Sequence, residues 1–137
     1  MIPIPNDSEL QSADTVPIKK PEAREQARLV AGLRRHWSFL HISERPIIAA
    51  VPNGGSRDAR EAMNMKTQGL LAGMPDLVII CPNRLTLWIE MKAPKDGRVS
   101  MDQTLIHNQI IGLGHTMIVA YSAEEALAKL REIQCKT

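Results

Sequence analysis

Two short runs of aliphatic and β-branched residues, joined by a three-residue turn, constrain the fold more than any other part of the chain. Residues 77–81 and 85–91 flank Pro82-Asn83-Arg84, which is the spacing of a β-hairpin with a short loop. Apolar side chains occur on both faces of this hairpin: Leu77, Ile79, Leu87 and Ile89 on one, and Val78, Ile80 and Trp88 on the other. A strand with only one buried face would alternate between apolar and polar residues. The hairpin is therefore expected at the centre of a sheet that is covered on both sides.

Helical and strand patterns alternate along the rest of the chain. A helical pattern begins at Pro21, and the segments after Ser100 and Ser122 have the spacing of a helix capping box. Further strands are expected at 47–51 and 117–121. The apolar residues at helical spacing are Ala27, Val30, Ala31 (or Leu33) and Trp37 in the first helix, and Leu105, Ile106, Ile110 and Leu113 in the helix after Ser100. The order α, β, β, β, α, β, α predicts an α/β fold.

Composition indicates one globular domain preceded by an arm. The 137 residues are 44% hydrophobic, which is ordinary for a domain with a core, and no apolar run is long enough to cross a bilayer. Residues 1–20 are expected to form a flexible arm, and residues 21–137 the domain. Cys81 and Cys135 lack metal-ligand spacing and are interpreted as packing residues. The expected location is the cytoplasm, that of a bacterial host if the chain is virus-encoded, with no membrane partner.

Charge and aromatic content limit the kind of partner that the chain can bind. A formal net charge of +2 is too small to indicate a nucleic-acid partner without further evidence from a site. Aromatic residues make up 3% of the chain, which leaves no platform for stacking successive bases and disfavours a dedicated single-strand binder. Recognition of a nucleic acid through its backbone and shape is the better fit.

The numbering of the hairpin places two carboxylates opposite each other. If Asn83 is the apex, Asp76 faces Glu90, and opposed β-carbons in such a pair lie about 5 Å apart. Side-chain alternation then puts Lys92 on the face of Glu90. Two carboxylates this close repel unless a cation lies between them, and oxygen ligands favour Mg²⁺ or Mn²⁺ over zinc. Such an ion acidifies water and polarises a phosphoryl oxygen, while an ammonium stabilises the charge on the phosphate. The three residues are therefore predicted to hydrolyse phosphodiesters.

The alternative is that these charges form surface ion pairs on an exposed sheet face. That alternative is weakened by the apolar residues on both faces of the hairpin, because charges at the end of a buried hairpin require a reason.

Five short blocks resemble one known family. Pro75-Asp76 followed by Glu90-Met91-Lys92 resembles the PD-(D/E)XK nuclease signature, and the longer pattern is similar to the VRR-NUC branch of that superfamily. The resemblance covers roughly residues 22 to 130. It is carried by residues 52–55, 65–69, 73–76, 89–92 and 100–103.

This resemblance implies a restriction-endonuclease-like αβββαβ core with a central mixed sheet flanked by helices. It further implies that Asp76, Glu90 and the backbone carbonyl of Met91 hold the metal, with Lys92 as the catalytic amine. The family also tends to place a glutamate in the first helix four residues before a glutamine. Glu22 fits this spacing, with Gln26 as the glutamine, and Glu25 is the alternative.

Two residues of the helix after Ser100 remain open to more than one interpretation. Gln103 matches a family glutamine that would reach the metal site, but a capping box with Ser100 uses a glutamine at the same position. His107 lies four residues later on the same side of the helix. A histidine with satisfied hydrogen bonds, or an exposed one, is the favoured interpretation of His107.

Candidate nucleic-acid contacts lie around the glycine turn. Asn53, Gly54 and Gly55 could let the main chain approach a phosphate, or form only a tight turn. Arg57 offers positive charge, and Lys66 belongs to a polar segment expected to hold a helical turn or two. Either side chain could equally be a solvated surface group.

Together these features predict a Mg²⁺-dependent endonuclease that cleaves DNA phosphodiesters, with branched or junction structures preferred. Symmetrical cutting of two strands would need a homodimer, because one small domain presents one active site. The competing hypothesis is a binding or assembly subunit that keeps the fold without catalysis. A small-molecule enzyme is disfavoured, since no glycine-rich nucleotide fingerprint follows a strand.

Overall fold

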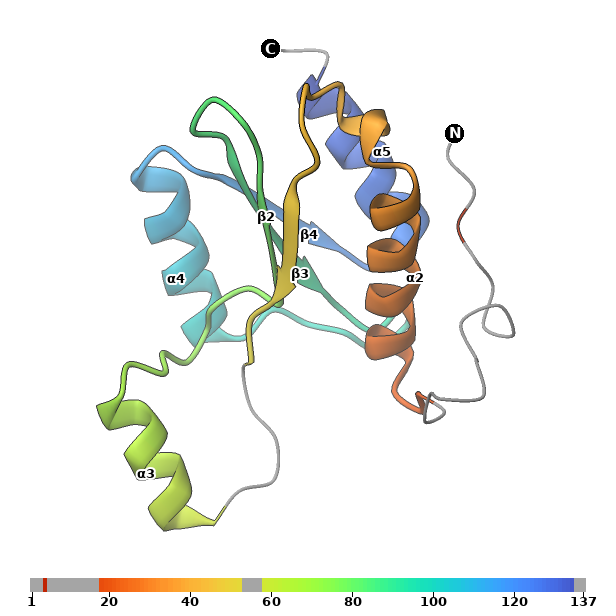
Figure 1. Cartoon of the computed structure of the whole chain (residues 1–137). Coiled ribbons are helices and arrows are strands. Elements are labelled where there is room, and N and C mark those ends of the chain that lie inside the picture. The colour runs from red at the N-terminus through yellow and green to blue at the C-terminus, as the bar shows by residue number, and fades with distance from the viewer. Residues whose placement is uncertain (1–3, 5–17, 53–57, 135–137) are drawn as a thin grey trace.

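The computed structural model describes Ile4 and residues 18–52 and 58–134. Figure 1 shows a central sheet with helices on both sides. In chain order the elements are α2 (Pro21–Arg35), the 3-10 helix η1 (Trp37–Leu40), β1 (Ile47–Ala50), α3 (Ala59–Thr67), β2 (Leu77–Ile80), β3 (Thr86–Met91), α4 (Met101–Gly112), β4 (Thr116–Ala120) and α5 (Ala123–Gln134). This order confirms the predicted α/β class and the expected core.

The sheet is mixed, with strand order β1-β2-β3-β4. Its first three strands are antiparallel, and β4 pairs parallel to β3 because the chain crosses over through α4. Leu77 pairs with Ile89 and Val78 with Trp88, the register that an apex at Asn83 predicts. Asn83 and Arg84 both adopt positive φ, at 61° and 64°, which turns the chain within the hairpin. The predicted register of the hairpin is confirmed.

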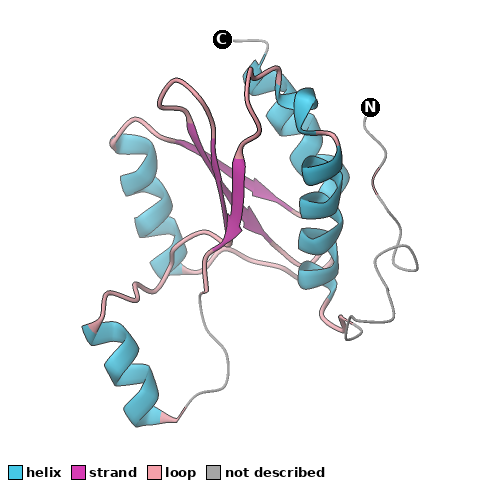
Figure 2. Ribbon diagram, in the orientation of Figure 1, coloured by secondary structure: helices cyan, strands magenta, loops and turns pink. Residues whose placement is uncertain are grey.

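One face of the sheet forms the main core. Figure 2 shows α2 and α5 packed on this side, and the hairpin side chains facing them, such as Leu77 and Ile89, are fully buried. On α2 the buried apolar residues are Leu29 and Leu33, one turn apart. The prediction was therefore right about Leu33 and missed Leu29, while Ala27 and Ala31 are only half-buried.

The other face is covered less completely than expected. Helix α4 lies over it, but Ile80 at the far end of β2 is 47% exposed. The predicted apolar face of α4 is wrong in part, because Leu105 and Leu113 point to solvent, 56% and 77% exposed. The residues of α4 that are buried are His107 and Ile110. Sequence periodicity failed here because this helix carries apolar residues all round and a polar group toward the sheet.

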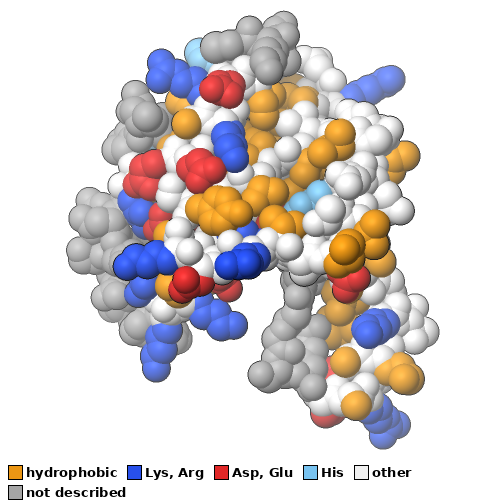
Figure 3. Space-filling view, turned by 180° about the vertical axis from the view of Figure 1, so that it is seen from behind, with side chains coloured by type: hydrophobic (Ala, Val, Ile, Leu, Met, Phe, Trp, Pro, Cys, Tyr) orange, Lys and Arg blue, Asp and Glu red, His pale blue; other side chains and the backbone are white. Residues whose placement is uncertain are grey.

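Helix α3 projects from the body of the molecule. Its N-cap Asp58 accepts a hydrogen bond from the backbone N–H of Glu61, 2.8 Å away, and it has no buried residue. Figure 3 shows it from behind as a separate protrusion that carries hydrophobic and charged side chains. The predicted helical segment is confirmed, at nine residues. The candidates Asn53, Gly54, Gly55 and Arg57 lie outside the described residues.

Three further expectations concern the chain as a whole. The flexible arm at 1–20 stays a prediction, and Ile4, which is described, is partly buried against the core. Cys81 is a buried packing residue as expected, whereas Cys135 lies outside the described residues. None of the helices in the described ranges is long and apolar enough to cross a membrane.

The core assignment predicts unequal costs for the same substitution in two helices. Leu127 on α5 is fully buried, so Leu127→Ala should lower the free energy of unfolding by about 2–5 kcal/mol. The matched control Leu105→Ala, on the exposed side of α4, should cost well under about 1 kcal/mol. Urea unfolding followed by circular dichroism measures both, and equal costs would contradict the packing described here.

Candidate active site

The candidate site lies at the edge of the sheet where β2 begins, β3 ends and α4 starts. A cavity of about 270 Å³ opens there. It is lined by Lys20, Glu22, Ala23, Gln26, Asp76, Glu90, Met91, Lys92 and Gln103. Five residues predicted from sequence for one site, Glu22, Asp76, Glu90, Lys92 and Gln103, thus line one cavity.

Asp76 is fixed in place by the backbone on either side of it. Its Oδ2 accepts a hydrogen bond from the Met91 N–H at 2.8 Å, and its carbonyl accepts one from the Val51 N–H at 2.7 Å. Gly73, which has positive φ, lets the preceding loop press against α4, because a Cβ there would lie 2.5 Å from the carbonyl oxygen of Asp102. Asp76 is therefore positioned by three strands and the start of α4.

Glu90 is the most deeply buried charged group described, with 1% of the residue exposed. Its Oε1 forms an ion pair with Lys92 Nζ, at 3.3 Å, and accepts a hydrogen bond from Gln103 Nε2. Its Oε2 is buried and has no hydrogen-bond partner among the described residues. Burial and the neighbouring Asp76 raise the pKa of Glu90 to about 7, against the opposing effect of Lys92. A buried carboxylate of this kind is not part of a surface ion pair, so the alternative of surface ion pairs on an exposed sheet face is wrong for Glu90.

Gln103 makes the contacts of a helix cap and also reaches Lys92 and Glu90. It completes a capping box with Ser100: the Gln103 N–H donates to Ser100 Oγ at 3.2 Å, and the Ser100 N–H donates to Gln103 Oε1 at 2.9 Å. The same Oε1 accepts a hydrogen bond from Lys92 Nζ at 2.7 Å. The cap thereby fixes the orientation of the amide, so that its oxygen faces Lys92 and its nitrogen faces Glu90.

The structure separates the two acidic candidates of the first helix. Glu25 turns away from the cavity: it pairs with Arg28 at 2.8 Å and accepts a hydrogen bond from the Ala123 N–H at 3.1 Å, at the start of α5. Glu22 lines the cavity, and so does Gln26 one turn later. Gln26 was noted in the sequence only as part of the spacing, although the i, i+4 relation to Glu22 already placed both on one face.

The cavity residues suit a hard divalent metal ion. Among the residues that the structure describes, no group of three or more His, Cys, Asp or Glu side chains gathers as a ligand set. Two facing carboxylates are present, however, and Oε2 of Glu90 is buried without a hydrogen-bond donor. Mg²⁺ commonly takes one or two carboxylates and keeps several waters. A site of two carboxylates completed by water and a backbone oxygen therefore fits Mg²⁺ better than zinc.

Two other residues lie differently from what the sequence suggested. Lys66 is exposed on the projecting α3 and does not line the cavity. His107, expected to be satisfied or exposed, is 6% exposed, and its Nε2 has no partner among the described residues. Burial, followed by Lys92, lowers the pKa of His107, while Asp76 opposes this. The sequence indicated that His107 lies near the site, because it follows Gln103 by one helical turn.

Comparisons with known proteins agree on one family. The sequence model of the VRR-NUC domain matches residues 12–124. Two solved structures are similar in fold. One, a VRR-NUC domain, has a TM-score of 0.53 and 19% identity over 83% of this chain and 97% of its own. The other, a VRR-NUC domain protein, has a TM-score of 0.64 and 20% identity over 84% and 88%. No curated protein matches the sequence.

The raised pKa of Glu90 predicts how stability depends on pH in the absence of metal. Below about pH 4.5 the carboxyl is protonated in both states; between there and about pH 7 only the folded state keeps the proton. The stability that the protonated carboxyl contributes is therefore lost as pH rises through about 7. Across this pH window the free energy of unfolding of wild type should fall, relative to that of Glu90→Gln, by at most on the order of 3 kcal/mol.

This prediction is measured as Tm against pH in excess chelator. Glu132→Gln, on the exposed side of α5, is the control and should track wild type at every pH. Parallel curves for wild type and Glu90→Gln would show that Glu90 titrates normally.

Proposed function

This chain belongs to the VRR-NUC domain family, a nuclease-type family, and we propose that it is a Mg²⁺-dependent endonuclease that hydrolyses phosphodiester bonds in DNA. One observation carries the proposal: a buried glutamate with an unpartnered oxygen lies beside a second carboxylate and a lysine. Neither a structural ion pair nor a packing role accounts for Oε2 of Glu90, because burying a carboxylate oxygen without a partner is costly. Cation binding offsets that cost.

The proposed metal ligands are Asp76, Glu90 and the backbone carbonyl of Met91. The bound ion would supply Lewis acidity for the scissile phosphate and lower the pKa of the attacking water. Asp76 accepts a hydrogen bond from the N–H of Met91, which holds these two proposed ligands next to each other. Mn²⁺ should replace Mg²⁺, since both accept oxygen ligands.

Lys92 is the proposed catalytic amine. Its ammonium is held by Glu90 and Gln103 and is largely buried, where a positive charge acts more strongly than in water. From this position it would donate hydrogen bonds to the phosphate oxygens as negative charge grows on them. Gln103 is a positioning residue, because it holds both Lys92 and Glu90. Glu22, on α2, would orient water at the opposite wall of the cavity.

The DNA is proposed to be duplex or branched, and two copies of the chain are proposed to act together. Each chain contributes one candidate active site, so cleavage of both strands at a junction requires a second site, and a twofold homodimer is the simplest arrangement. Lys66 on the projecting α3, with Asn53, Gly54, Gly55 and Arg57 before it, is proposed to contact the phosphate backbone. These contacts would position the substrate without reading sequence.

The alternative function is a binding or assembly subunit with the same fold. It requires neither the buried carboxylate nor the held lysine, since affinity for phosphate comes from exposed basic groups. Cleavage assays separate the two.

Cleavage should depend on a divalent metal ion. Purified protein is incubated with linear duplex, flap and four-way-junction DNA under four conditions: Mg²⁺, Mn²⁺, Ca²⁺ and excess chelator. We expect cutting in Mg²⁺ or Mn²⁺, binding with little cutting in Ca²⁺, and neither cutting nor metal-induced stabilisation in chelator. Mg²⁺ should also raise the Tm of wild type but not of Glu90→Gln. Full cleavage in chelator would exclude this mechanism.

Lys92→Ala should separate catalysis from binding. Single-turnover cleavage should fall by roughly a hundredfold or more, because a preorganised charge is lost from the transition state. Affinity for DNA, measured by gel shift in Ca²⁺, should stay within about threefold of wild type, since many basic contacts share it. Lys95→Ala, an exposed lysine three residues later, is the matched control and should change neither quantity appreciably. A Lys92→Ala protein that cuts at the wild-type rate would favour the binding-module alternative.

A further inference from the structure

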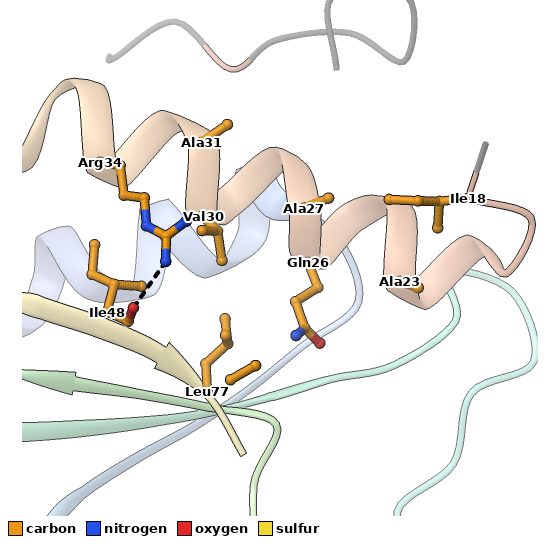
Figure 4. A pocket seen from close by; sticks show the side chains of 10 residues that line it. Ile18, Ala23, Gln26, Ala27, Val30, Ala31, Arg34, Ile48 and Leu77 are labelled. Carbon is orange, nitrogen blue, oxygen red and sulfur yellow. Dashed lines mark hydrogen bonds between the residues drawn. The ribbon is translucent and has the colours of Figure 1, made fainter. Parts of the chain in front are cut away.

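A second cavity runs along helix α2 from the candidate active site. It has a volume of about 480 Å³ and lies against the N-terminal half of the fold, between α2 and the first two strands (Figure 4). We call it the α2 groove. Its lining residues are Ile18, Ala23, Gln26, Ala27, Val30, Ala31, Arg34, Ile48, Ala50 and Leu77.

The α2 groove is continuous with the candidate active site. Ala23 and Gln26 line both cavities, one as part of the wall beside Asp76 and Glu90 and the other as the near end of the groove. A single ligand could therefore extend from the site into the groove. The cavity beside the β2–β3 turn and the cavity beside Trp37 share no lining residue with the site.

Most of the residues that line the groove are apolar. Three alanines at i, i+4 and i+8 of α2 line it, namely Ala23, Ala27 and Ala31, and small side chains there leave space. Ile48 and Leu77, from β1 and β2, line the sheet side. A flat apolar ligand is what such walls accommodate.

Polar groups occur at the two ends of the groove. At the near end the carboxamide of Gln26 points toward the strands (Figure 4) and has no hydrogen-bond partner among the described residues. At the far end Arg34 donates a hydrogen bond to the carbonyl of Ile48 at 3.1 Å, so its guanidinium spans from α2 to β1. An amide that both donates and accepts, and a cation with further N–H groups, suit a flat heterocycle with polar edges and an anionic backbone.

We infer that the α2 groove binds the base of one unpaired nucleotide next to the scissile phosphate. The inference rests on the proposed function, because the nucleotide is taken from a DNA substrate held in the site. The volume lies within the range of about 300–1,000 Å³ that small-ligand pockets have. Bases that leave a duplex are commonly held between apolar side chains and recognised by hydrogen bonds at their edges.

A base-binding groove predicts that the preferred substrate has an unpaired nucleotide. Taking a base out of a duplex costs free energy, and the cost is smallest where the base is already unpaired. Branch points and bulges supply such bases, whereas a fully paired duplex does not. The groove thus selects DNA with an unpaired nucleotide at the cut.

The first experiment detects the base directly. A duplex with a single-nucleotide bulge carries 2-aminopurine at the bulge, and its fluorescence is followed as protein is added in Ca²⁺. The groove has no aromatic lining residue to quench the probe, so emission should rise and become shielded from acrylamide. The same DNA is tested by gel shift. Binding in the gel without a change in emission would overturn the inference, while the proposed endonuclease function would stand.

The second experiment compares cleavage of the bulged DNA with that of the same DNA carrying an abasic site at the bulge. Wild type should cut the base-containing strand about tenfold faster, because the base buries apolar surface against the groove. Ala50→Leu, on the exposed side of β1, and Ala27→Leu should each fill the groove, remove this preference and remove the rise in emission. Ala128→Leu, on the exposed side of α5, is the matched control and should keep both.

The outcomes separate the two hypotheses. If wild type cuts both substrates equally, the base site is overturned and the nuclease remains. If no DNA is cut but 2-aminopurine still enters the groove, the proposed function fails and the base site stands. If Ala50→Leu changes only the sedimentation coefficient, the groove holds a second copy of the chain and the inference is wrong.

Discussion

The burial of the Glu90 carboxylate is the constraint on which the rest of the structure depends. A charge removed from water must be compensated, and the chain provides only part of that compensation through Lys92 and Gln103. The remaining oxygen has no partner among the described residues, and the nearby Asp76 adds repulsion. This arrangement is unfavourable for a purely structural network and favourable for binding a cation. On the proposed function, a bound metal ion would offset this cost.

The fold holds the residues around this unfavourable group in place with hydrogen bonds to the backbone. Asp76 is tied to Met91 across the hairpin and to Val51 of the neighbouring segment. Gln103 joins the start of α4 to the end of β3 through the same side chain that caps the helix. A change at Gln103 therefore alters helix stability and site geometry together. Function and folding share contacts here, which is why neither interpretation of Gln103 excludes the other.

Helix α2 has one face in the core and another along the site. Leu29 and Leu33 anchor it against the sheet, while Glu22 and Gln26 reach the cavity from its first turns. Glu25, between them, is engaged at the start of α5 and so fixes the rotation of the helix. With α2 held in this way, the amide of Gln26 lies at the boundary between the candidate active site and the α2 groove. The candidate site and the groove are thus parts of one surface whose geometry α2 sets.

The sequence by itself determined the hairpin and the grouping of Asp76, Glu90 and Lys92, because strand register and side-chain alternation are local and periodic. It also identified Gln103 through cap spacing, a signal confined to four residues. Only the tertiary structure decided that Glu22, and not Glu25, faces the cavity. Both glutamates belong to the first turns of the same helix, and Glu25 is drawn away because the start of α5 donates a hydrogen bond to it. It alone revealed that α4 buries His107 while Leu105 and Leu113 face solvent. In such a helix the buried face follows from what packs against it, which is a property of contacts between segments far apart in the chain.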